Sequence, residues 1–526
     1  MIPIAIILFF TLALAVQVIS LAGTANSTRL VPKQMATRLV FAHFMVGATS
    51  TRRSVSDYDE DMRRAKALGI DAFALNIGVD SYTDQQLELA YESAARNLMK
   101  VFISFDFNWW QTDQAADIGY KIVQFATRPA QLTVDNKVFA STFGGDGLNE
   151  AALRAAAGMP IFFAPNFHPG FGADISTVDG LFNWLAWPHD GRNKAPTQYS
   201  NISVGDGDQA YLNALAGRAY VALSPWFFTH FGPEVSYSKN WVFPSDLLWY
   251  DRWHEVLAMG PRFIEIVSWN DYGESHYTGP LNSPHTDDGA SKWVNDMPHD
   301  AWLEMAKPFI AAFKAGASSP DNYITSDQLI YWYRPSLRNQ NCDMTDTCMS
   351  LANNISGSYF LGRPDGWQCM EDSLFVVSLL HSAASVQINS GGILHSYNAP
   401  AGSFAQAVPM NPGDQSFAVH RNGKLILVGT SPKKIIDGCV CGLYNFNAYV
   451  GSLPEAIVGT LQPDGLISFS HGLHVQTCEA TPSLKGLARD LSTGSAYAVR
   501  TEKATSMSNL RQAASTIYPA LPTRGI

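Results

Sequence analysis

The segment Phe263-Ile264-Glu265-Ile266-Val267-Ser268 is apolar except for Glu265 and its last residue, and it leads directly into the polar segment Trp269–Tyr277. Short apolar runs of the same kind, rich in Val, Ile, Phe and Ala, recur earlier in the chain. Such runs are typical of parallel strands that are buried on both faces. We therefore expect eight buried strands, at Leu39–Val46, Ala72–Ile77, Val101–Phe105, Val138–Thr142, Ile161–Pro165, Phe182–Ala186, Tyr220–Leu223 and Phe263–Ser268.

Amphipathic helical patterns separate most of these runs. Apolar residues from Val55 to Leu68 recur every three or four positions, which is one face of a helix, and Gly69 predicts its end. The alternation of strands and helices predicts an α/β fold, a (β/α)8 TIM barrel over residues 38–315. The other expected helix signals are a Thr83–Gln86 capping box, Asn149 capping Glu150–Ala157, Ser245 capping Asp246–Met259, and a last helix at Ala301–Ala315 that contains Pro308.

The chain changes character after the segment Ala315–Pro320, which has the composition of a linker. Turn signals such as Asn411-Pro412-Gly413-Asp414 and Asn422-Gly423 alternate there with short apolar runs such as Phe375–Leu379. This pattern predicts a C-terminal antiparallel β-sandwich domain over residues 321–500, followed by a tail at 501–526.

The amino terminus has the pattern of a targeting segment. Residues Ile2–Val16 are apolar apart from Thr11, and the small residues Ala22 and Ala25 follow. We expect residues 1–25 to be a cleaved signal peptide and the protein to be secreted. An uncleaved membrane anchor at Ile2–Gly23 is the alternative.

The cysteine pattern agrees with secretion. All six cysteines follow residue 340, and an even number in one region predicts three disulfides there. A zinc site is the alternative, but no Cys-x-x-Cys pair is present. Glycosylation acceptors occur at Asn26, Asn201 and Asn354. The cysteines are Cys342, Cys348, Cys369, Cys439, Cys441 and Cys478.

The charge balance excludes one large class of partners. The 526 residues carry a formal net charge of −10. Binding to nucleic acid needs a basic surface, so we expect no nucleic-acid partner. After the amino-terminal segment the sequence has no apolar stretch long enough to cross a bilayer, so we expect no stable membrane partner either.

Polar residues stand at the ends of the predicted strands, where barrel enzymes place their active sites. Two carboxylates, Asp271 and Glu274, follow the eighth strand within four residues, and Asp106 follows the third. Paired carboxylates hydrolyse glycosidic bonds, one as acid and the other as base or nucleophile. A capping Asp and a solvated Glu are the structural alternative. The other residues at strand ends are His43, Asn76, Asp146, Asn166, His168, Asp190 and Ser224.

The tryptophans favour a sugar ligand. Eleven of the 13 lie before residue 310. Six of them stand at or near predicted strand ends, where flat rings can pack on sugar rings, although any one of them can simply fill the core. They are Trp109, Trp110, Trp184, Trp187, Trp226 and Trp269, and the loops expected to build a cleft around them are Phe171–Ile175, His189–Ser203, Phe231–Val242 and Gly279–Met297.

Other chemistries lack their motifs. The sequence has no phosphate loop, no Gly-x-Gly-x-x-Gly after the first strand and no Gly-x-Ser-x-Gly elbow. No cysteine lies in the barrel region, and no histidine cluster has metal-ligand spacing. We expect no cofactor and no catalytic metal.

Three segments resemble the fungal α-1,3-glucanases, or mutanases, of glycoside hydrolase family 71. They are Val40–Gly47, Gly69–Asn76 and Trp269–Ser275, of which the last is the most specific. The resemblance covers about residues 38–310. It implies a hydrolase of (1→3)-α-D-glucan, the polymer of fungal cell walls, acting outside the cell with inversion of configuration. It also implies that Asp271 and Glu274 are the essential pair and that Asp106 is a further important carboxylate.

We assign the residue roles on this basis as a hypothesis. Glu274 is the general acid and Asp271 the base, or the reverse. We expect a monomer whose partner is the polysaccharide. The residues expected to bind it are His43, Asn76, Trp109, Trp110, Asn166, His168, Trp187, Trp226, Trp269, Asn270 and Tyr272.

Two alternatives stay open at this point. One is a barrel glycosidase that acts on a β-linked glucan. The other is a wall-glucan-binding protein that has the barrel but no catalytic activity. Endo versus exo action cannot be read from the residues.

Overall fold

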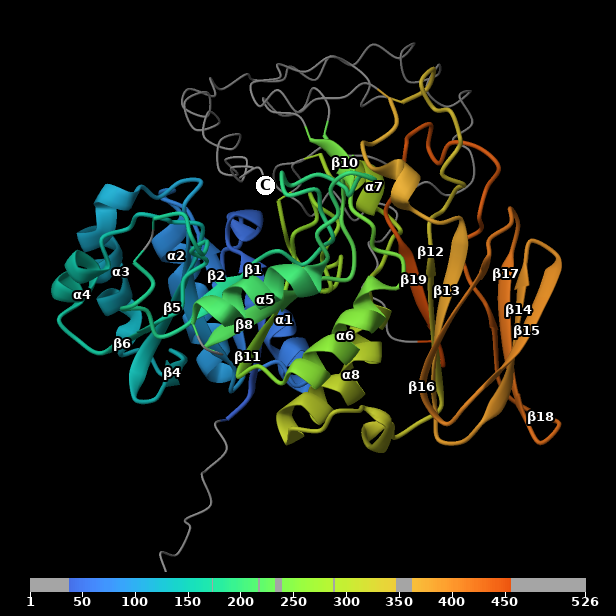
Figure 1. The fold of residues 1–526 in the computed structure, drawn as a ribbon, viewed down its shortest axis with the longest axis horizontal. Coiled ribbons are helices and arrows are strands. Elements are labelled where there is room, and N and C mark those ends of the chain that lie inside the picture. Colours follow the sequence, from blue (N-terminus) through green and yellow to red (C-terminus); the bar gives the residue numbers. More distant parts are fainter. Residues whose placement is uncertain are drawn as a thin grey trace, which may run out of the picture. The chain divides into compact units, whose positions relative to one another are not determined.

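A computed structural model describes residues 37–172, 174–215, 218–231, 239–286, 289–346 and 362–455. The predicted signal peptide, the sequons at Asn26 and Asn354, Cys348, Cys478 and the tail after residue 501 lie outside the described residues, as do residues 456–500 of the predicted C-terminal domain. Within the described ranges the chain forms a mixed α/β structure with one large, mainly parallel sheet and separate antiparallel sheets (Figure 1).

All eight predicted apolar runs are strands of the large sheet, which curls so that its carboxyl-terminal strand ends come together (Figure 1). The strand order is β4-β5-β3-β2-β1-β11-β8-β7, with β6 paired to β5, and every pair except β4–β5 is parallel. The strands are β1 (Leu39–Met45), β2 (Ala72–Ile77), β3 (Lys100–Asp106), β4 (Thr133–Val134), β5 (Lys137–Phe143), β6 (Ile161–Phe163), β7 (Leu181–Asn183), β8 (Ala219–Leu223) and β11 (Phe263–Ile266).

Among the described residues, β6 and β7 form no ladder with each other, so the paired sheet is open between them. Backbone hydrogen bonds still cross this gap: Phe182 N donates to Pro165 O at 2.8 Å, and Asp179 N, just before β7, donates to Phe163 O at 2.9 Å. The parallel strands therefore form a curled sheet whose two edges are joined by hydrogen bonds but not by a ladder.

Aromatic rings fill the inner face of this sheet. The rings of Phe41 (β1), Phe102 (β3) and Phe139 (β5) have centroids 4.6–5.4 Å apart, and Tyr220 (β8) and Phe263 (β11) pack against Phe139. Alternate residues of a strand point to the same face. The polar residues at the strand ends therefore follow these rings on the same inner face, which places the candidate site above a closed aromatic layer.

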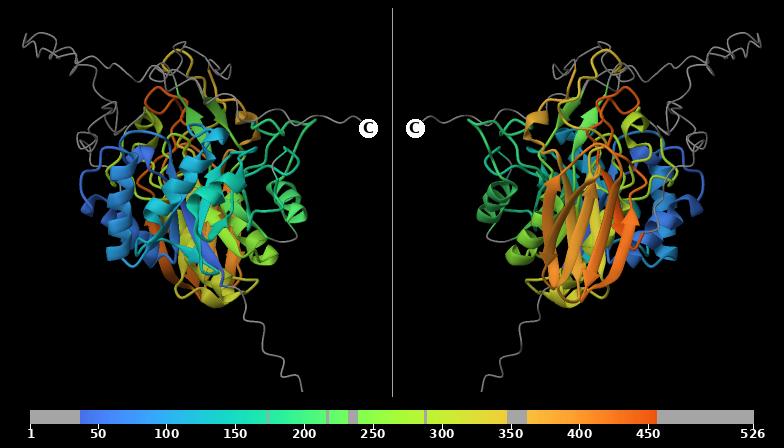
Figure 2. Two further views of the ribbon diagram at one scale, coloured as in Figure 1. Left: turned by 90° about the vertical axis from the view of Figure 1, so that its left-hand side faces the viewer. Right: turned by 90° about the vertical axis from the view of Figure 1, so that its right-hand side faces the viewer.

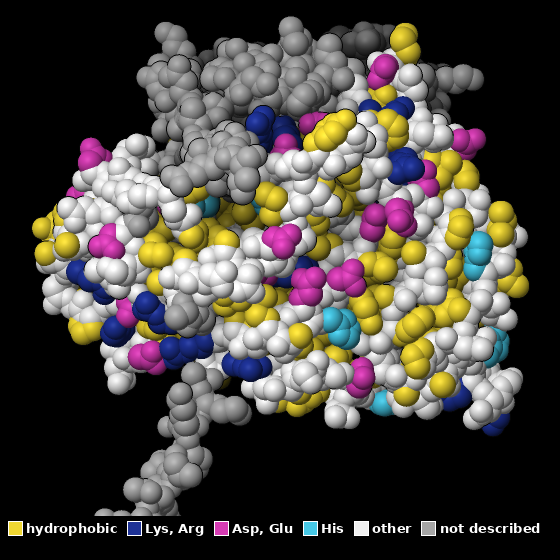
Figure 3. Space-filling model, in the orientation of Figure 1, with side chains coloured by type: hydrophobic (Ala, Val, Ile, Leu, Met, Phe, Trp, Pro, Cys, Tyr) yellow, Lys and Arg dark blue, Asp and Glu magenta, His cyan; other side chains and the backbone are white. Residues whose placement is uncertain are grey.

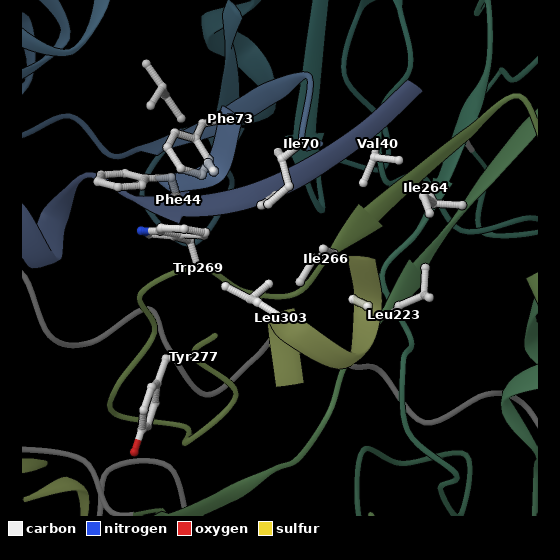
Figure 4. Packing of buried hydrophobic residues seen from close by; sticks show 14 of the residues in the cluster. Val40, Phe44, Ile70, Phe73, Leu223, Ile264, Ile266, Trp269, Tyr277 and Leu303 are labelled. Atoms are coloured by element: carbon white, nitrogen blue, oxygen red, sulfur yellow. The ribbon is translucent and has the colours of Figure 1, made fainter. Parts of the chain in front are cut away.

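Helices follow most of the strands and cover the outer face of the sheet. Tryptophan and aliphatic side chains fill the layer between them, as Figure 4 shows for Trp269 against Phe73 and Phe44. The helices are α1 (Ser56–Ala67), α2 (Thr83–Arg96), α3 (Ala115–Ala126), α4 (Glu150–Ala157), α5 (Val204–Ala214), α6 (Leu248–Met259), α7 (Ser291–Val294) and α8 (Asp300–Ala315), with 3-10 turns η1 (Gly47–Thr49), η2 (Thr112–Gln114), η3 (Asp321–Tyr323) and η5 (Trp367–Cys369).

Two helix ends follow the predictions. Asn149 caps α4 and accepts the backbone N–H of Ala152 at 3.0 Å. Gly69 ends α1 with a φ of +92°, and a Cβ there would stand 2.9 Å from Ile310. Only glycine fits both conditions without strain.

Two predicted caps are wrong. Thr83 is already helical, and the Gln86 side chain bonds the Tyr58 hydroxyl and the Arg52 carbonyl, so no capping box forms. Ser245 donates its hydroxyl to the Phe243 carbonyl, and α6 begins only at Leu248. Gln86 thus bonds groups of a neighbouring segment, and Ser245 bonds a carbonyl two positions earlier instead of a helix N–H.

The C-terminal region forms two four-stranded antiparallel sheets, whose strands run side by side in Figure 2. Their orders are β16-β13-β12-β19 and β15-β14-β17-β18, and one hydrophobic cluster contains side chains of both, including the stacked rings of Tyr331 and Phe417. The strands are β12 (Gln328–Tyr333), β13 (Ser373–Leu380), β14 (Ala384–Ser390), β15 (Ile393–Ala399), β16 (Gly402–Pro409), β17 (Gln415–Arg421), β18 (Lys424–Thr430) and β19 (Tyr449–Leu453).

The disulfide prediction is confirmed in part. Cys342 and Cys439 form a disulfide across 97 positions of the chain, and Cys441 is also disulfide-bonded. Cys369 carries a free thiol, so the prediction of three disulfides is wrong at this residue. Its Sγ instead lies 3.5 Å from the Pro196 carbonyl, which buries the thiol partly against a loop.

Charged side chains of both signs are spread over the face of the molecule shown in Figure 3, with hydrophobic and neutral polar side chains between them. Throughout the part of the chain that the structure describes, no helix is both long and apolar enough to cross a membrane.

Candidate active site

The segment after β11 forms a closed loop at the carboxyl end of the sheet. Ser268 N donates to His276 O at 2.8 Å, and Thr278 N donates to Ser268 O at 3.0 Å, so the two ends of the loop are tied to each other. Within it, Asn270 bonds both backbone groups of Met45, at the end of β1. The loop is thus fixed at its base and against the neighbouring strand.

This loop brings Asp271 and Glu274 together, as the sequence predicted. Glu274 N donates to Oδ1 of Asp271 at 3.0 Å. One carboxylate oxygen of each residue and one ring nitrogen of His276 all lie within 4.8 Å of one another. The side chains of Asp271 and Glu274 are 19% and 21% exposed, so both remain partly accessible to solvent.

Lys239 is the cation of the site. Its Nζ lies 2.5 Å from Oε1 of Glu274, and the chain reaches it just before the strand β10 (Asn240–Val242), which pairs with β9 (Phe228–His230). Burial alone would raise the pKa of Glu274, but Lys239 and His276 lower it to about 2. The pKa of Asp271 is raised, first by burial and then by the Glu274 charge. The environment therefore favours the ionised form of Glu274 and opposes ionisation of Asp271.

Asp106 ends β3 and is only 5% exposed. It accepts the backbone N–H of Asn108 at 2.9 Å, and the Asn76 side chain also bonds it. Burial raises the pKa of Asp106 to about 6, although His43 and Lys239 counteract the rise. Asn76, one of the residues predicted to bind substrate, is thus placed beside a predicted catalytic carboxylate.

His43 lies on the inner face of β1 below these groups. Its Nδ1 is 2.7 Å from Oε1 of Glu265, and both side chains are almost fully buried. Its Nε2 is buried without a hydrogen-bond partner, and the ring packs edge-on against Trp184. Glu265, the exceptional polar residue of its apolar run, therefore serves to orient His43.

Several predicted substrate-binding residues are engaged by the protein itself. Asn166 bonds Gly144 N and Phe182 O and so bridges β5 and β7. Tyr272 donates its hydroxyl to Pro280 O and stacks on His285. Asn166 and Asn270 therefore hold strand ends together, whereas Tyr272 ties its own loop to the segment that follows it.

The tryptophans divide into core and rim. Trp226 and Trp269 have no exposed surface, and their indole N–H groups bond Phe446 O and Asp61 Oδ1. Trp110 is buried and donates to Ile77 O. The structure contradicts a direct sugar contact for Trp226 and Trp269, because a ring without exposed surface cannot stack on a ligand.

Two of the predicted aromatic residues differ from these: one lies close to the carboxylates, and the other is partly exposed. Trp187 is 5% exposed and its ring packs on His276, with centroids 5.3 Å apart. Trp109 is partly exposed and follows Asp106 by three residues. His168 is also partly exposed, and its Nδ1 lies 2.6 Å from Asp146 at the end of the neighbouring strand.

The sequence did not single out Lys239, His276 or Ser268. Lys239 lies in a predicted cleft loop, Phe231–Val242, but no local motif marks it. His276 and Ser268 flank the acidic segment, and the available signal was a histidine two and five residues after the carboxylates and eight residues after the serine.

The triplet Asp271, Glu274 and His276 has the spacing of a metal-binding group among the described residues. The Lys239 ammonium already stands 2.5 Å from Glu274 and balances its charge. A divalent cation at the same position would have to overcome that repulsion, so the donor set suits proton chemistry better than metal binding.

At the carboxyl ends of this curled parallel sheet, the pKa values of neighbouring carboxyl groups are displaced in opposite directions. Enzymes that cleave glycosidic bonds use such pairs of carboxyl groups as catalytic residues. The comparison with known families agrees. The chain belongs to glycosyl hydrolase family 71, whose model matches residues 36–462. It is therefore a glycoside hydrolase.

The curated relatives are fungal. The chain is 40% identical to a mutanase of Penicillium rubens over 85% of its own length and 95% of the relative. It is 39% identical to a glucan endo-1,3-α-glucosidase of Schizosaccharomyces pombe, covering 80% and 95%. An ascus wall endo-1,3-α-glucanase of the same yeast is 30% identical, with coverage of 78% and 96%.

Solved structures are only distantly similar. A family 99 endo-α-mannosidase of Bacteroides thetaiotaomicron superimposes with a TM-score of 0.36 and 15% identity, over 53% of this chain and 98% of the other. A β-glycosidase of Bacteroides vulgatus gives a TM-score of 0.37 and 10% identity, over 75% and 49%. At this level of similarity, neither structure supports any conclusion about this site.

Proposed function

We propose that the protein hydrolyses (1→3)-α-D-glucosidic linkages of a fungal cell-wall α-glucan. The observation that carries the proposal is the group of Asp106, Asp271 and Glu274 around Lys239, in which the pKa values of two carboxyl groups are raised and that of the third is lowered. The names of the relatives, mutanase and endo-1,3-α-glucosidase, support the linkage and a cut within the chain.

The spacing of the carboxyl groups bears on their roles. An inverting pair stands ~6.5–9.5 Å apart so that water fits between the base and the sugar. Asp271 and Glu274 have oxygens within 4.8 Å, which is too close for the acid and base of inversion. The assignment of Glu274 and Asp271 as acid and base to each other therefore needs revision.

Asp106 provides the second position. It ends β3, which is separated from β11 by β2 and β1. Three strand spacings of ~4.8 Å put the two backbones roughly 14 Å apart, and inward-pointing side chains shorten that gap toward the inverting distance. In the proposal, Asp106 protonates the leaving oxygen, Glu274 accepts the proton of the attacking water, and Asp271 orients that water.

The first experiment is reducing-sugar release from insoluble α-1,3-glucan, with laminarin as the β-linked control. Wild type should act only on the α-linked polymer, and Asp106→Asn, Asp271→Asn and Glu274→Gln should each lose about 100-fold or more. Asp190→Asn is the matched control, because Asp190 bonds only a local turn. If the wild-type protein binds the glucan but releases no reducing sugar, the hypothesis of a glucan-binding protein replaces that of an enzyme.

A second substrate separates the roles. A dinitrophenyl glycoside of an α-1,3-gluco-oligosaccharide has a leaving group that needs no proton. Asp106→Asn should keep activity within about tenfold on it, whereas Glu274→Gln should lose activity on both substrates. The anomer first seen by NMR gives the stereochemistry, and β-product is the expected result of inversion.

The same proposal covers the architecture around the site. The Phe182–Pro165 hydrogen bond supports a (β/α)8 barrel at residues 38–315 that closes between β6 and β7, and the shared cluster of the two antiparallel sheets supports a sandwich domain from residue 321 onward.

A substrate in the cell wall requires export of the enzyme, which the apolar segment at residues 1–25 would direct. N-terminal sequencing of protein recovered from culture medium tests this, and a retained Met1 would contradict cleavage.

A further inference from the structure

The hydroxyl of Ser268 lies between the backbone N–H of Asp271 and the buried ring of His276. Asp271 N donates to Ser268 Oγ at 2.8 Å, and Ser268 Oγ lies 3.1 Å from Nδ1 of His276. Both Ser268 and His276 have no exposed surface. The contacts therefore persist without competition from bulk water.

The direction of these hydrogen bonds follows from what Nε2 of His276 faces. Ser268 Oγ accepts a hydrogen from Asp271 N and has a second acceptor site, so this contact alone fits either direction of the Nδ1 hydrogen bond. Nε2 lies beside the ionised Glu274 carboxylate, which can only accept a hydrogen bond. In a neutral His276 the proton is therefore on Nε2, and Nδ1 accepts the hydroxyl hydrogen of Ser268.

Nε2 of His276 faces the two loop carboxylates. It lies 3.2 Å from Oε2 of Glu274 and 3.6 Å from Oδ2 of Asp271. The opposite oxygen of Glu274 receives Lys239, and the ring is held between Trp187 and Phe227. One fixed N–H thus contacts the Glu274 carboxylate and stands near the Asp271 carboxylate.

We propose that Ser268 and His276 are positioning residues of the reaction: Ser268 fixes the proton of His276 on Nε2, and His276 then holds Asp271 and Glu274 at their mutual spacing. This inference rests on the proposed function, in which those two carboxylates handle the water. Neither residue touches the substrate, so each acts through the carboxylates.

A purely structural role makes a different prediction. Ser268 also ties the loop together through its backbone N–H and carbonyl, and Ser268→Ala leaves both of those groups in place. The variant therefore removes the hydroxyl but retains the loop closure. Ser283→Ala is the matched control, because its buried hydroxyl bonds Asp61 rather than a loop carboxylate or His276.

The first readout is spectroscopic. In the full-length protein with ¹⁵N-labelled histidine, the His276 signals are assigned by their loss in His276→Gln. The neutral ring of the wild type should show an unprotonated Nδ1 and a protonated Nε2, and Ser268→Ala should shift the tautomer toward Nδ1–H. A neutral wild-type His276 that carries its proton on Nδ1 would overturn the proposal. This measurement needs no turnover, so it can contradict the role of Ser268 without contradicting the proposed glucanase activity.

The second readout is kinetic. Ser268→Ala should lower kcat on α-1,3-glucan about 10- to 100-fold, the factor of one buried hydrogen bond, with KM within about twofold. Ser268→Thr keeps the hydroxyl and should recover most of kcat, and His276→Gln, which retains a donor near Nε2, should exceed His276→Ala. Equal kcat in Ser268→Ala, Ser283→Ala and wild type would refute the proposed role.

Discussion

The ammonium of Lys239 lies 2.5 Å from Oε1 of Glu274, although 35 positions separate the two residues in the chain. The same ammonium also lowers the pKa values of Asp106 and Asp271. One cation from the segment before β10 therefore sets the charge of carboxyl groups that come from two different strand ends.

Lys239→Met should change the acid side of the pH profile. The pKa of Glu274 is lowered to about 2, so the carboxylate is ionised at any working pH. Without the ammonium the pKa of Glu274 should rise toward the ordinary value of about 4.3, so kcat/KM should fall about threefold more at pH 4 than at pH 6. Lys307→Met, which removes an exposed pair with Glu304, is the control. An unchanged acid limb of the pH profile would show that Lys239 does not control the pKa of Glu274.

The alkaline side of the profile should report Asp106. Burial raises its pKa to about 6, and the proposed acid works only while protonated. The wild-type kcat/KM should therefore fall about tenfold per pH unit above roughly pH 6 to 7. In Asp106→Asn the residual activity on the activated glycoside should lose this limb. Persistence of the limb in that variant would assign it to another group.

Asp246→Asn should stabilise the protein, and more so at high pH. Burial raises the pKa of Asp246 to about 7, so the native state binds this proton more tightly than the unfolded chain does. The stability contribution of the group is complete below about pH 4 and is lost as the pH rises through about 7. The variant should gain about 1–2 kcal/mol at pH 8 and little at pH 4. Thermal midpoints at the two pH values measure this; an equal shift at both would contradict it.

The disulfide between Cys342 and Cys439 should contribute measurably to stability. It closes a loop of 97 positions, and cross-links of long loops restrict the unfolded chain most. The double variant Cys342→Ser, Cys439→Ser should lose about 2–4 kcal/mol in urea unfolding. Cys369→Ser, which removes a free thiol, should change stability by less than about 0.5 kcal/mol. Equal losses in both variants would point to damaged packing instead.

Two tryptophans should behave in opposite ways. Trp226→Phe removes a buried hydrogen bond to the Phe446 carbonyl and should cost about 1–3 kcal/mol of stability, with KM within twofold. Trp109→Ala, at a partly exposed ring near Asp106, should raise KM several-fold and leave the thermal midpoint nearly unchanged. A raised KM in Trp226→Phe would mean that the buried ring reaches substrate after all.

The strands could be predicted because burial on both faces demands an unbroken apolar run. Ala72–Ile77 is identical in prediction and structure, and the Phe263–Ser268 run differs only at its end, where Val267 and Ser268 leave the ladder. The failed caps at Thr83 and Ser245 show the limit of local patterns. At the first, Gln86 bonds Tyr58 and Arg52, which are distant in the sequence, and at the second, Ser245 bonds the Phe243 carbonyl two positions earlier.

The site could be predicted only in its carboxylates. Asp106, Asp271 and Glu274 stand at strand ends, a position that the fold itself marks. Lys239 could not be found this way, since its contact with Glu274 exists only after folding. Trp226 and Trp269 were indistinguishable from rim residues, because the same indole ring serves packing and stacking equally well.

The aromatic layer formed by Phe41, Phe102, Phe139, Tyr220 and Phe263 has a consequence for traffic through the enzyme. These rings are at most 4% exposed and leave no passage beneath the carboxyl groups. A polymer that enters meets a dead end and cannot be threaded through the sheet. In the proposed α-1,3-glucanase, a glucan chain therefore lies across the strand ends and leaves from the side on which it arrived, a geometry that suits attack on the surface of an insoluble polymer.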